Sequence, residues 1–127
     1  MKIVLDTHII LHAAADALSE KRSALLEVPS NELYISAVSL WEITKLSEFG
    51  YATFDQGFEH FMRSLCAHPR YAIVPYSADL MITLGALAPK LHKDPADQLI
   101  AATAVLLGAS LMTDDGKLKK AKVATVV

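Results

Sequence analysis

Four acidic residues stand where they could act together on a substrate: Asp6, Glu42, Asp97 and Asp115. Asp6 directly follows an apolar run at residues 3–5, and Asp115 closes an acidic pair that follows another run at residues 110–113. Carboxylates that converge at ~5 Å repel one another by ~3 kcal/mol per pair at an effective dielectric of about 20, so they must take up protons or a cation. Oxygen ligands suit Mg²⁺ or Mn²⁺, and Mg²⁺ pairs readily with substrate phosphates. The pattern therefore predicts a divalent-cation site for phosphodiester hydrolysis.

Glu42 and Asp97 lie within segments of helical periodicity. Each has apolar residues three or four positions away on its own side of the helix, so each side chain faces packed material or a cleft. Each also has a simpler structural explanation, because Glu42 could pair with Lys45 and Asp97 could complete a capping box begun by Asp94. Only the joint placement of all four acids favours a shared site.

The four carboxylates can meet only if a sheet brings together the ends of the strands that precede them. Apolar runs rich in β-branched residues predict five short strands, at residues 3–5, 33–35, 71–74, 110–113 and 122–127. Helical patterns lie between them, at residues 9–18, after a cap at Ser19, from Ser36 or Ser39 to Gly50, and at residues 54–65, 78–87 and 95–107. This alternation predicts an α/β/α sandwich with a central parallel sheet of about five strands. In such sheets, ligands bind at the carboxyl ends of the strands.

The composition limits the class of protein. The 127 residues are enough for one domain, which we place at residues 1–127. Hydrophobic residues make up 53% of the chain, which excludes a disordered protein, and the net charge of −2 confines any nucleic-acid contact to a local basic patch. Cys66 is the only cysteine, which excludes an intramolecular disulfide and a Cys-rich zinc cluster. The single cysteine leads us to expect a cytoplasmic protein. The longest uncharged stretch, residues 98–113, is too short to span a membrane.

Four segments resemble known signature motifs, in the order in which a known family carries them. They are LDTH at residues 5–8, SAVSLWEI at 36–43, HKDPADQLIAATA at 92–104 and LMTDD at 111–115. Together they resemble the motifs of PIN-domain ribonucleases, and most closely those of VapC-type toxins of type II toxin–antitoxin modules. Any one motif is weak evidence, but four in order across nearly the whole chain are specific.

The resemblance implies an endoribonuclease whose four acids bind Mg²⁺ or Mn²⁺. It assigns Asp94 to a helix cap, and it suggests that Thr7 and Thr113 hydrogen-bond either the carboxylates or a metal-bound water. It also implies three partners: an RNA substrate, a small cognate antitoxin protein and a second copy of the chain in a homodimer. The sequence departs from the family pattern at Gln98, where many relatives carry a basic residue, and at residues 116–118, where an aromatic is common. Both departures concern substrate contacts or loop packing.

Other interpretations fit parts of the pattern. An Asp-based phosphotransfer domain also has an Asp after its first strand, but it would need a second acid where Thr7 and His8 stand. A non-catalytic RNA- or protein-binding module of the same fold would tolerate loss of the acids. A zinc site built on His8 and His12 lacks a third His or Cys at a suitable spacing.

The basic segment at residues 117–122 has two interpretations of equal weight. Its four lysines, Lys117, Lys119, Lys120 and Lys122, form either a solvated edge or a contact for RNA phosphates beside Asp115.

Overall fold

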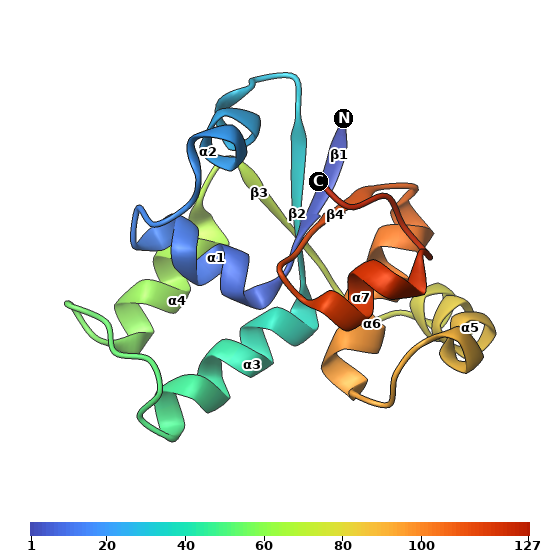
Figure 1. The fold of residues 1–127 in the computed structure, drawn as a ribbon. Helices are drawn as coiled ribbons and strands as arrows, with labels where there is room; N and C mark the ends of the chain where they lie inside the picture. The colour runs from blue at the N-terminus through green and yellow to red at the C-terminus, as the bar shows by residue number, and fades with distance from the viewer.

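Four parallel strands form the centre of the molecule, in the order β3-β2-β1-β4 (Figure 1). The computed structural model describes all residues from 1 to 127. The strands are β1 (Lys2–Leu5), β2 (Glu32–Ser36), β3 (Tyr71–Val74) and β4 (Ser110–Met112). Since β1 pairs with both β2 and β4, the residues that follow β1 and β4 emerge side by side at the carboxyl edge of the sheet.

Helices cover both faces of this sheet (Figure 1). They are α1 (Thr7–Ala14), α2 (Glu20–Glu27), α3 (Ala37–Glu48), α4 (Phe58–Ala67), α5 (Ala78–Leu87), the 3₁₀ turn η1 (Ala88–Lys90), α6 (Pro95–Leu107) and α7 (Gly116–Ala121). Helices α5, α6 and α7 gather on one side of the sheet and α1, α2 and α4 on the other (Figure 1). None of these helices is both long and apolar enough to cross a membrane.

Strand β1 shows why both faces must be covered. Ile3 and Leu5 point into one apolar cluster and Val4 into the other, because successive side chains of a strand alternate between the two faces. All three side chains are completely buried. Burying an aliphatic side chain stabilises the fold by roughly 1.5–3 kcal/mol, so a continuous apolar run is favoured in a strand packed on both sides. The predicted α/β/α sandwich is confirmed.

The predicted fifth strand at residues 122–127 is wrong, because the sheet has four strands. Lys122 adopts a left-handed conformation with φ of 53°, which breaks the extended backbone where that strand was expected to begin. Only the last residues approach the sheet, through an isolated parallel bridge between Leu111 and Val126. The polar residues before this segment fold as α7, a helix that the sequence analysis did not predict.

Helix α6 begins and ends as its sequence predicts. The Asp94 side chain accepts a hydrogen bond from the backbone N–H of Asp97 at 3.1 Å, and Pro95 occupies the first helical position. Gly108 ends the helix in a left-handed conformation with φ of 61°, which glycine adopts without steric cost. The middle of the helix is fully buried, as its apolar sequence requires.

Helix α4 begins later than predicted. The aromatic spacing placed its start at Phe54, but Gly57 has φ of 87° and the helix starts at Phe58. Phe54 nevertheless stacks on Phe61, with ring centroids 4.3 Å apart. The aromatic periodicity therefore reflects a packed cluster of rings that extends beyond the helix itself.

Candidate active site

Asp6 and Thr113 join the ends of the two neighbouring strands β1 and β4. Asp6 is 6% exposed, and its Oδ2 accepts a hydrogen bond from the Thr113 hydroxyl at 2.5 Å. Its Oδ1 accepts a second hydrogen bond, from the backbone N–H of Thr7 at 2.7 Å, at the start of α1. These bonds hold a buried carboxylate at the carboxyl edge of the sheet, where the sequence predicted it.

Thr7 connects Asp6 to Glu42 on α3. The Thr7 hydroxyl donates to Glu42 Oε1 at 2.5 Å and lies 3.0 Å from the hydroxyl oxygen of Ser39, one turn earlier in α3. Burial raises the pKa of Glu42, the bond from Thr7 lowers it in part, and the charges of Asp6 and Asp97 raise it further. Glu42 is therefore an electrostatic neighbour of two other members of the acidic group.

Asp97 is paired with His92, which the sequence analysis had not singled out as a site residue. His92 Nε2 lies 2.7 Å from Asp97 Oδ2, and the two side chains are 20% and 18% exposed. Burial raises the pKa of Asp97, the bond to His92 lowers it, and the charges of Asp94, Asp115 and Asp6 raise it. His92 Nδ1 is buried and has no hydrogen-bond partner.

Gln98 holds the segment that carries His92. Its side-chain amide donates to the backbone carbonyl of His92 at 2.9 Å. The residue that departs from the family pattern therefore has a structural contact here.

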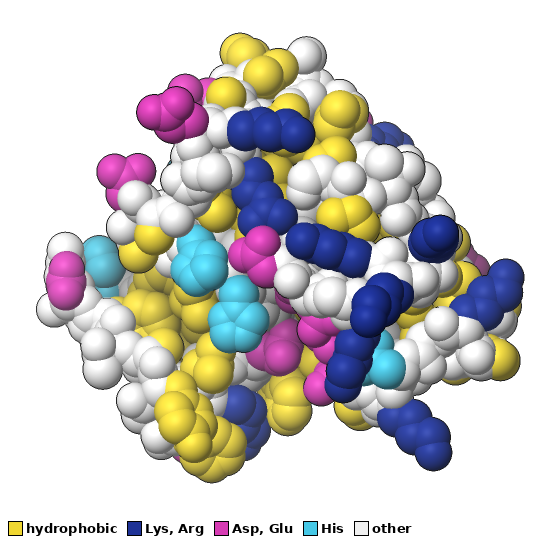
Figure 2. All heavy atoms as spheres, viewed as in Figure 1, with side chains coloured by type: hydrophobic (Ala, Val, Ile, Leu, Met, Phe, Trp, Pro, Cys, Tyr) yellow, Lys and Arg dark blue, Asp and Glu magenta, His cyan; other side chains and the backbone are white.

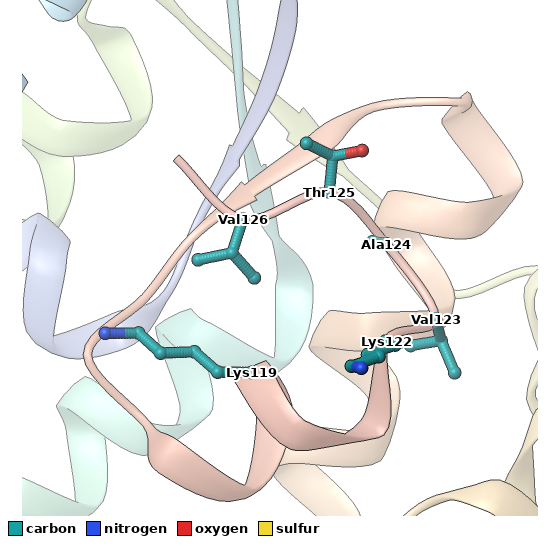
Figure 3. Close-up of a pocket in the computed structure, with 6 residues that line it drawn as sticks. All are labelled: Lys119, Lys122, Val123, Ala124, Thr125 and Val126. Atoms are coloured by element: carbon teal, nitrogen blue, oxygen red, sulfur yellow. The ribbon is translucent and has the colours of Figure 1, made fainter.

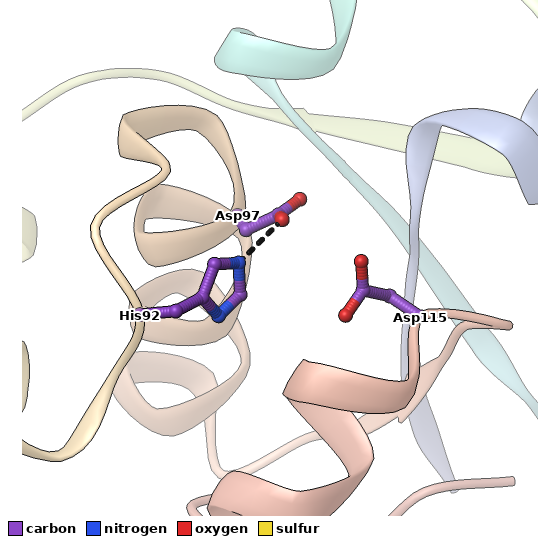
Figure 4. A group of neighbouring side chains, drawn as sticks. All are labelled: His92, Asp97 and Asp115. Atoms are coloured by element: carbon purple, nitrogen blue, oxygen red, sulfur yellow. Dashed lines mark hydrogen bonds and ion pairs between the residues drawn. The ribbon is translucent and has the colours of Figure 1, made fainter.

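Asp115 faces this pair from the start of α7 (Figure 4). One ligand atom from each of His92, Asp97 and Asp115 lies within 4.8 Å of the other two. Asp115 Oδ1 also accepts hydrogen bonds from the backbone N–H groups of Lys117 at 2.8 Å and Leu118 at 2.9 Å, so the residue caps α7. The sequence analysis did not anticipate this capping role.

Arg22 fixes the loop between β4 and α7 from α2. Its guanidinium pairs with Asp114 Oδ1 at 2.6 Å and donates to the backbone carbonyl of Thr113 at 2.9 Å. The bond from Arg22 holds the pKa of Asp114 below its usual value. Thr113 binds Asp6, and Asp115 directly follows Asp114 in the chain. Arg22 therefore supports two parts of the acidic edge, the name used below for Asp6, Glu42, Asp97 and Asp115 at the carboxyl ends of the strands.

The four predicted acids therefore lie at one edge of the sheet, but not as one tight cluster. Asp97 and Asp115 approach each other with His92, whereas Asp6 and Glu42 are joined through Thr7. The suggested contacts of Thr7 and Thr113 with carboxylates are confirmed.

Sequence reasoning missed two contributors, His92 and Arg22. His92 opens the third motif and could have been found as an imidazole five residues before Asp97. Arg22 lies 92 residues from Asp114 and carries no local signal.

In each of three acids, one carboxylate oxygen is held by the protein and the other is free. Glu42 Oε1, Asp97 Oδ2 and Asp115 Oδ1 have hydrogen-bond partners, whereas the second oxygen of each has none. Oriented carboxylates with an unpartnered oxygen are suited to binding a cation. The arrangement is an open α/β sheet with an acidic group at its carboxyl edge.

Comparison with known families identifies the class of protein that has this fold and this acidic group at the edge of its sheet. The PIN-domain family model matches residues 3–124, so the chain belongs to the PIN-domain family. Within it, the chain is similar to Ribonuclease VapC22 of Mycobacterium tuberculosis, with 30% identity over 119 residues, covering 92% of this chain and 89% of that relative. The resemblance to PIN-domain ribonucleases of the VapC type is confirmed.

Solved structures share the fold over the whole chain. A VapBC2 structure from Rickettsia felis, bound to a promoter DNA fragment, has a TM-score of 0.75 and 22% identity, and covers 100% of this chain and 98% of that one. VapBC-1 from nontypeable Haemophilus influenzae has a TM-score of 0.77 and 21% identity, and covers 100% and 97%. At this level of identity, the likeness concerns the fold.

Proposed function

We propose that this PIN-domain protein is a divalent-cation-dependent endoribonuclease and the toxin of a toxin–antitoxin pair in the cytoplasm. Its proposed metal ligands are Asp6, Glu42, Asp97 and Asp115, and its proposed cation is Mg²⁺ or Mn²⁺. The observation that carries the proposal is the set of free carboxylate oxygens at the carboxyl edge of the sheet.

The donor set fits a hard divalent cation. Carboxylate oxygens are the preferred ligands of Mg²⁺ and Mn²⁺. Burial and neighbouring acids raise the pKa of Glu42 and of Asp97, which means that the metal-free site disfavours its own full ionisation. A divalent cation would relieve this repulsion.

The residues around the acids would set the geometry of such a site. Thr113 and the backbone of Thr7 orient Asp6, the Thr7 hydroxyl orients Glu42, and His92 orients Asp97. Partners of this kind typically change metal affinity or activity by about 10- to 100-fold. When bound, the cation supplies Lewis acidity, which neutralises phosphate charge and makes water a stronger nucleophile.

The test is RNA cleavage by the purified protein in Mn²⁺, in Mg²⁺ and in excess EDTA. We expect cleavage only with metal, and by family resemblance the products should carry 5′-phosphate and 3′-hydroxyl ends. Asp6→Asn should abolish cleavage, whereas Asp16→Asn removes the same charge at an exposed turn and should leave it unchanged. Asn suits the Asp16 backbone, whose φ is 53°. Full activity in EDTA would remove the metal from the proposal.

The same variants separate the proposal from its rivals. A non-catalytic RNA- or protein-binding module would bind its partner without cleaving RNA, and Asp6→Asn would not matter to it. An Asp-based phosphotransfer domain would become phosphorylated at Asp6. RNA cleavage that is lost in Asp6→Asn, together with an Asp6 that carries no phosphate in the parent, excludes both alternatives.

An antitoxin partner is supported by the structures of similar fold. Those from Rickettsia felis and Haemophilus influenzae are of VapBC assemblies, and one from Klebsiella pneumoniae is described as a toxin–antitoxin complex. We expect expression of the chain alone to arrest growth, and co-expression of a small antitoxin to relieve the arrest. Normal growth of the original host without any antitoxin would contradict the toxin assignment.

The homodimer stays a prediction. Helix α5 has an apolar face suited to it, because Met81 is 43% and Ile82 70% exposed. A monomer mass in solution would refute it.

A further inference from the structure

Helix α7 and the residue that follows it present four lysines to solvent, and the helix is packed against the core. Leu118 is 2% exposed within the core cluster that also contains Val4 and Leu111, and Ala121 packs against the same cluster. Because these two apolar residues lie three positions apart, they hold one side of the helix against the protein. The lysines lie between and beyond them and are all exposed: Lys117, Lys119, Lys120 and Lys122.

None of these four lysines forms an ion pair, although they account for a third of the chain's 12 Lys and Arg residues. Three of the other eight basic side chains are neutralised locally. Arg22 pairs with Asp114, Lys45 with Glu48, and Arg63 with Glu59. In a chain whose net charge is −2, α7 is therefore a concentrated patch of free positive charge.

This patch borders the acidic edge. Helix α7 starts directly after Asp115, whose Oδ1 accepts hydrogen bonds from the backbone N–H groups of Lys117 and Leu118 in its first turn. Figure 2 shows acidic side chains in the middle of this face, with Lys and Arg side chains over α7 on one side and two His side chains over α1 on the other. Lys119 and Lys122 also border a surface hollow between α7 and residues 123–126 (Figure 3).

We propose that α7 is a phosphate-binding rim that holds the backbone of single-stranded RNA beside the acidic edge. This inference rests on the proposed nuclease function and names the surface that delivers its substrate. A polyanion that approaches four carboxylates is repelled, so binding needs compensating positive charge close by. Exposed lysines supply that charge without reading base sequence.

The dimensions favour a single strand. A six-residue helix is about 9 Å long, which matches two or three nucleotides of one strand. On α2, Arg22 is already paired with Asp114 and so adds no free charge to the patch. We therefore expect few phosphate contacts, each contributed by one lysine.

The test measures RNA binding in EDTA, where the proposed cleavage cannot occur, for the parent and for a Lys117→Gln/Lys120→Gln double variant. The probe is a short fluorescein-labelled oligouridylate, and its anisotropy is followed over a range of salt concentrations. Each lost phosphate contact lowers the slope of log K against log[salt] by about 0.7 for single strands, so the double variant should lose about 1.4. Its affinity at about 50 mM salt should fall about tenfold or more.

The matched control is Lys2→Gln/Arg63→Gln, which removes the same charge away from the rim. Lys2 starts β1 at the opposite end of the strand from Asp6, and Arg63 lies on α4 in an exposed pair with Glu59. This control should keep the parental slope. Equal slopes for both double variants would overturn the rim, as would α7-dependent binding of duplex DNA in preference to the RNA.

Cleavage of the same RNA by the parent in Mn²⁺ is measured separately. If the parent binds through α7 but never cleaves, the nuclease proposal fails and the RNA-binding rim stands. If the parent cleaves while the α7 variant binds with the parental slope, only the rim is wrong.

Discussion

Asp115→Asn should stabilise the metal-free protein while removing its activity. The side chain lies within 4.8 Å of a ligand atom of Asp97, a separation at which two carboxylates repel by about 3.5 kcal/mol at an effective dielectric of about 20. Both groups are partly exposed, so solvent screening reduces the gain to about 1 kcal/mol. Asn accepts the same two backbone hydrogen bonds at the start of α7, so the helix cap is kept.

Thermal melting in EDTA and in Mn²⁺ measures this effect. A gain of about 1 kcal/mol raises the melting temperature of a domain of this size by about 4 °C in EDTA. In Mn²⁺ the parent should have the higher melting temperature, because only the parent is stabilised by tight metal binding. RNA cleavage should fall by about a hundredfold or more, since a direct ligand matters at least as much as the groups that orient it.

The neighbouring acid provides the control. Asp114→Asn removes the same charge one residue away, but from a carboxylate that pairs with Arg22 at 2.6 Å. Asp114 is 56% exposed, and in the Asn variant Arg22 keeps a side-chain oxygen to donate to and its bond to the Thr113 carbonyl, so the change should lower stability slightly and leave cleavage intact. If Asp115→Asn melts below the parent in EDTA, or cleaves RNA like the parent, the argument from carboxylate repulsion is refuted.

Three further predictions follow from the same edge. Burial raises the pKa of Glu42 and of Asp97, so the native state keeps protons that the unfolded chain releases near pH 4. Stability in EDTA should therefore fall as pH rises from about 4 through the raised pKa values, and urea melts over this range should show a smaller fall for Glu42→Gln. A flat profile for the parent would contradict this. Arg22→Ala removes two hydrogen bonds to the β4–α7 loop, so it should lower the free energy of unfolding in urea by about 1–2 kcal/mol and weaken Mn²⁺ binding. Unchanged metal affinity would show that the position of the loop does not depend on Arg22. Asp94→Asn should stay folded and active because Asn caps helices as well as Asp does, and a loss of cleavage would make Asp94 a fifth functional acid.

The sequence was sufficient for features that depend on local chemistry. The Asp94-Pro95 start and Gly108 end of α6 were predicted because capping uses residues close together in the chain. The buried strand β1 was predicted because its apolar run admits no exposed face.

Features set by distant contacts could not be predicted. The brace from Arg22 to Asp114 spans 92 positions and has no periodic signal. The last strand was predicted wrongly because its Val-rich residues form only an isolated bridge at the edge of the sheet after α7. β-propensity does not distinguish such a bridge from a strand. For the site, the sequence predicted that the four acids share one edge, but it did not show that His92 would approach Asp97 and Asp115 more closely than Asp6 or Glu42 does.

Direct titration of Mn²⁺ into the metal-free protein, followed by calorimetry, tests the central claim most directly. We expect a binding event that Asp6→Asn and Asp115→Asn each weaken by about a hundredfold, because each variant removes a proposed ligand, while Asp16→Asn and Asp114→Asn bind as the parent does. If all five proteins bind Mn²⁺ with the same affinity, or if none binds it, the acidic edge is not a metal site and the proposed mechanism is wrong.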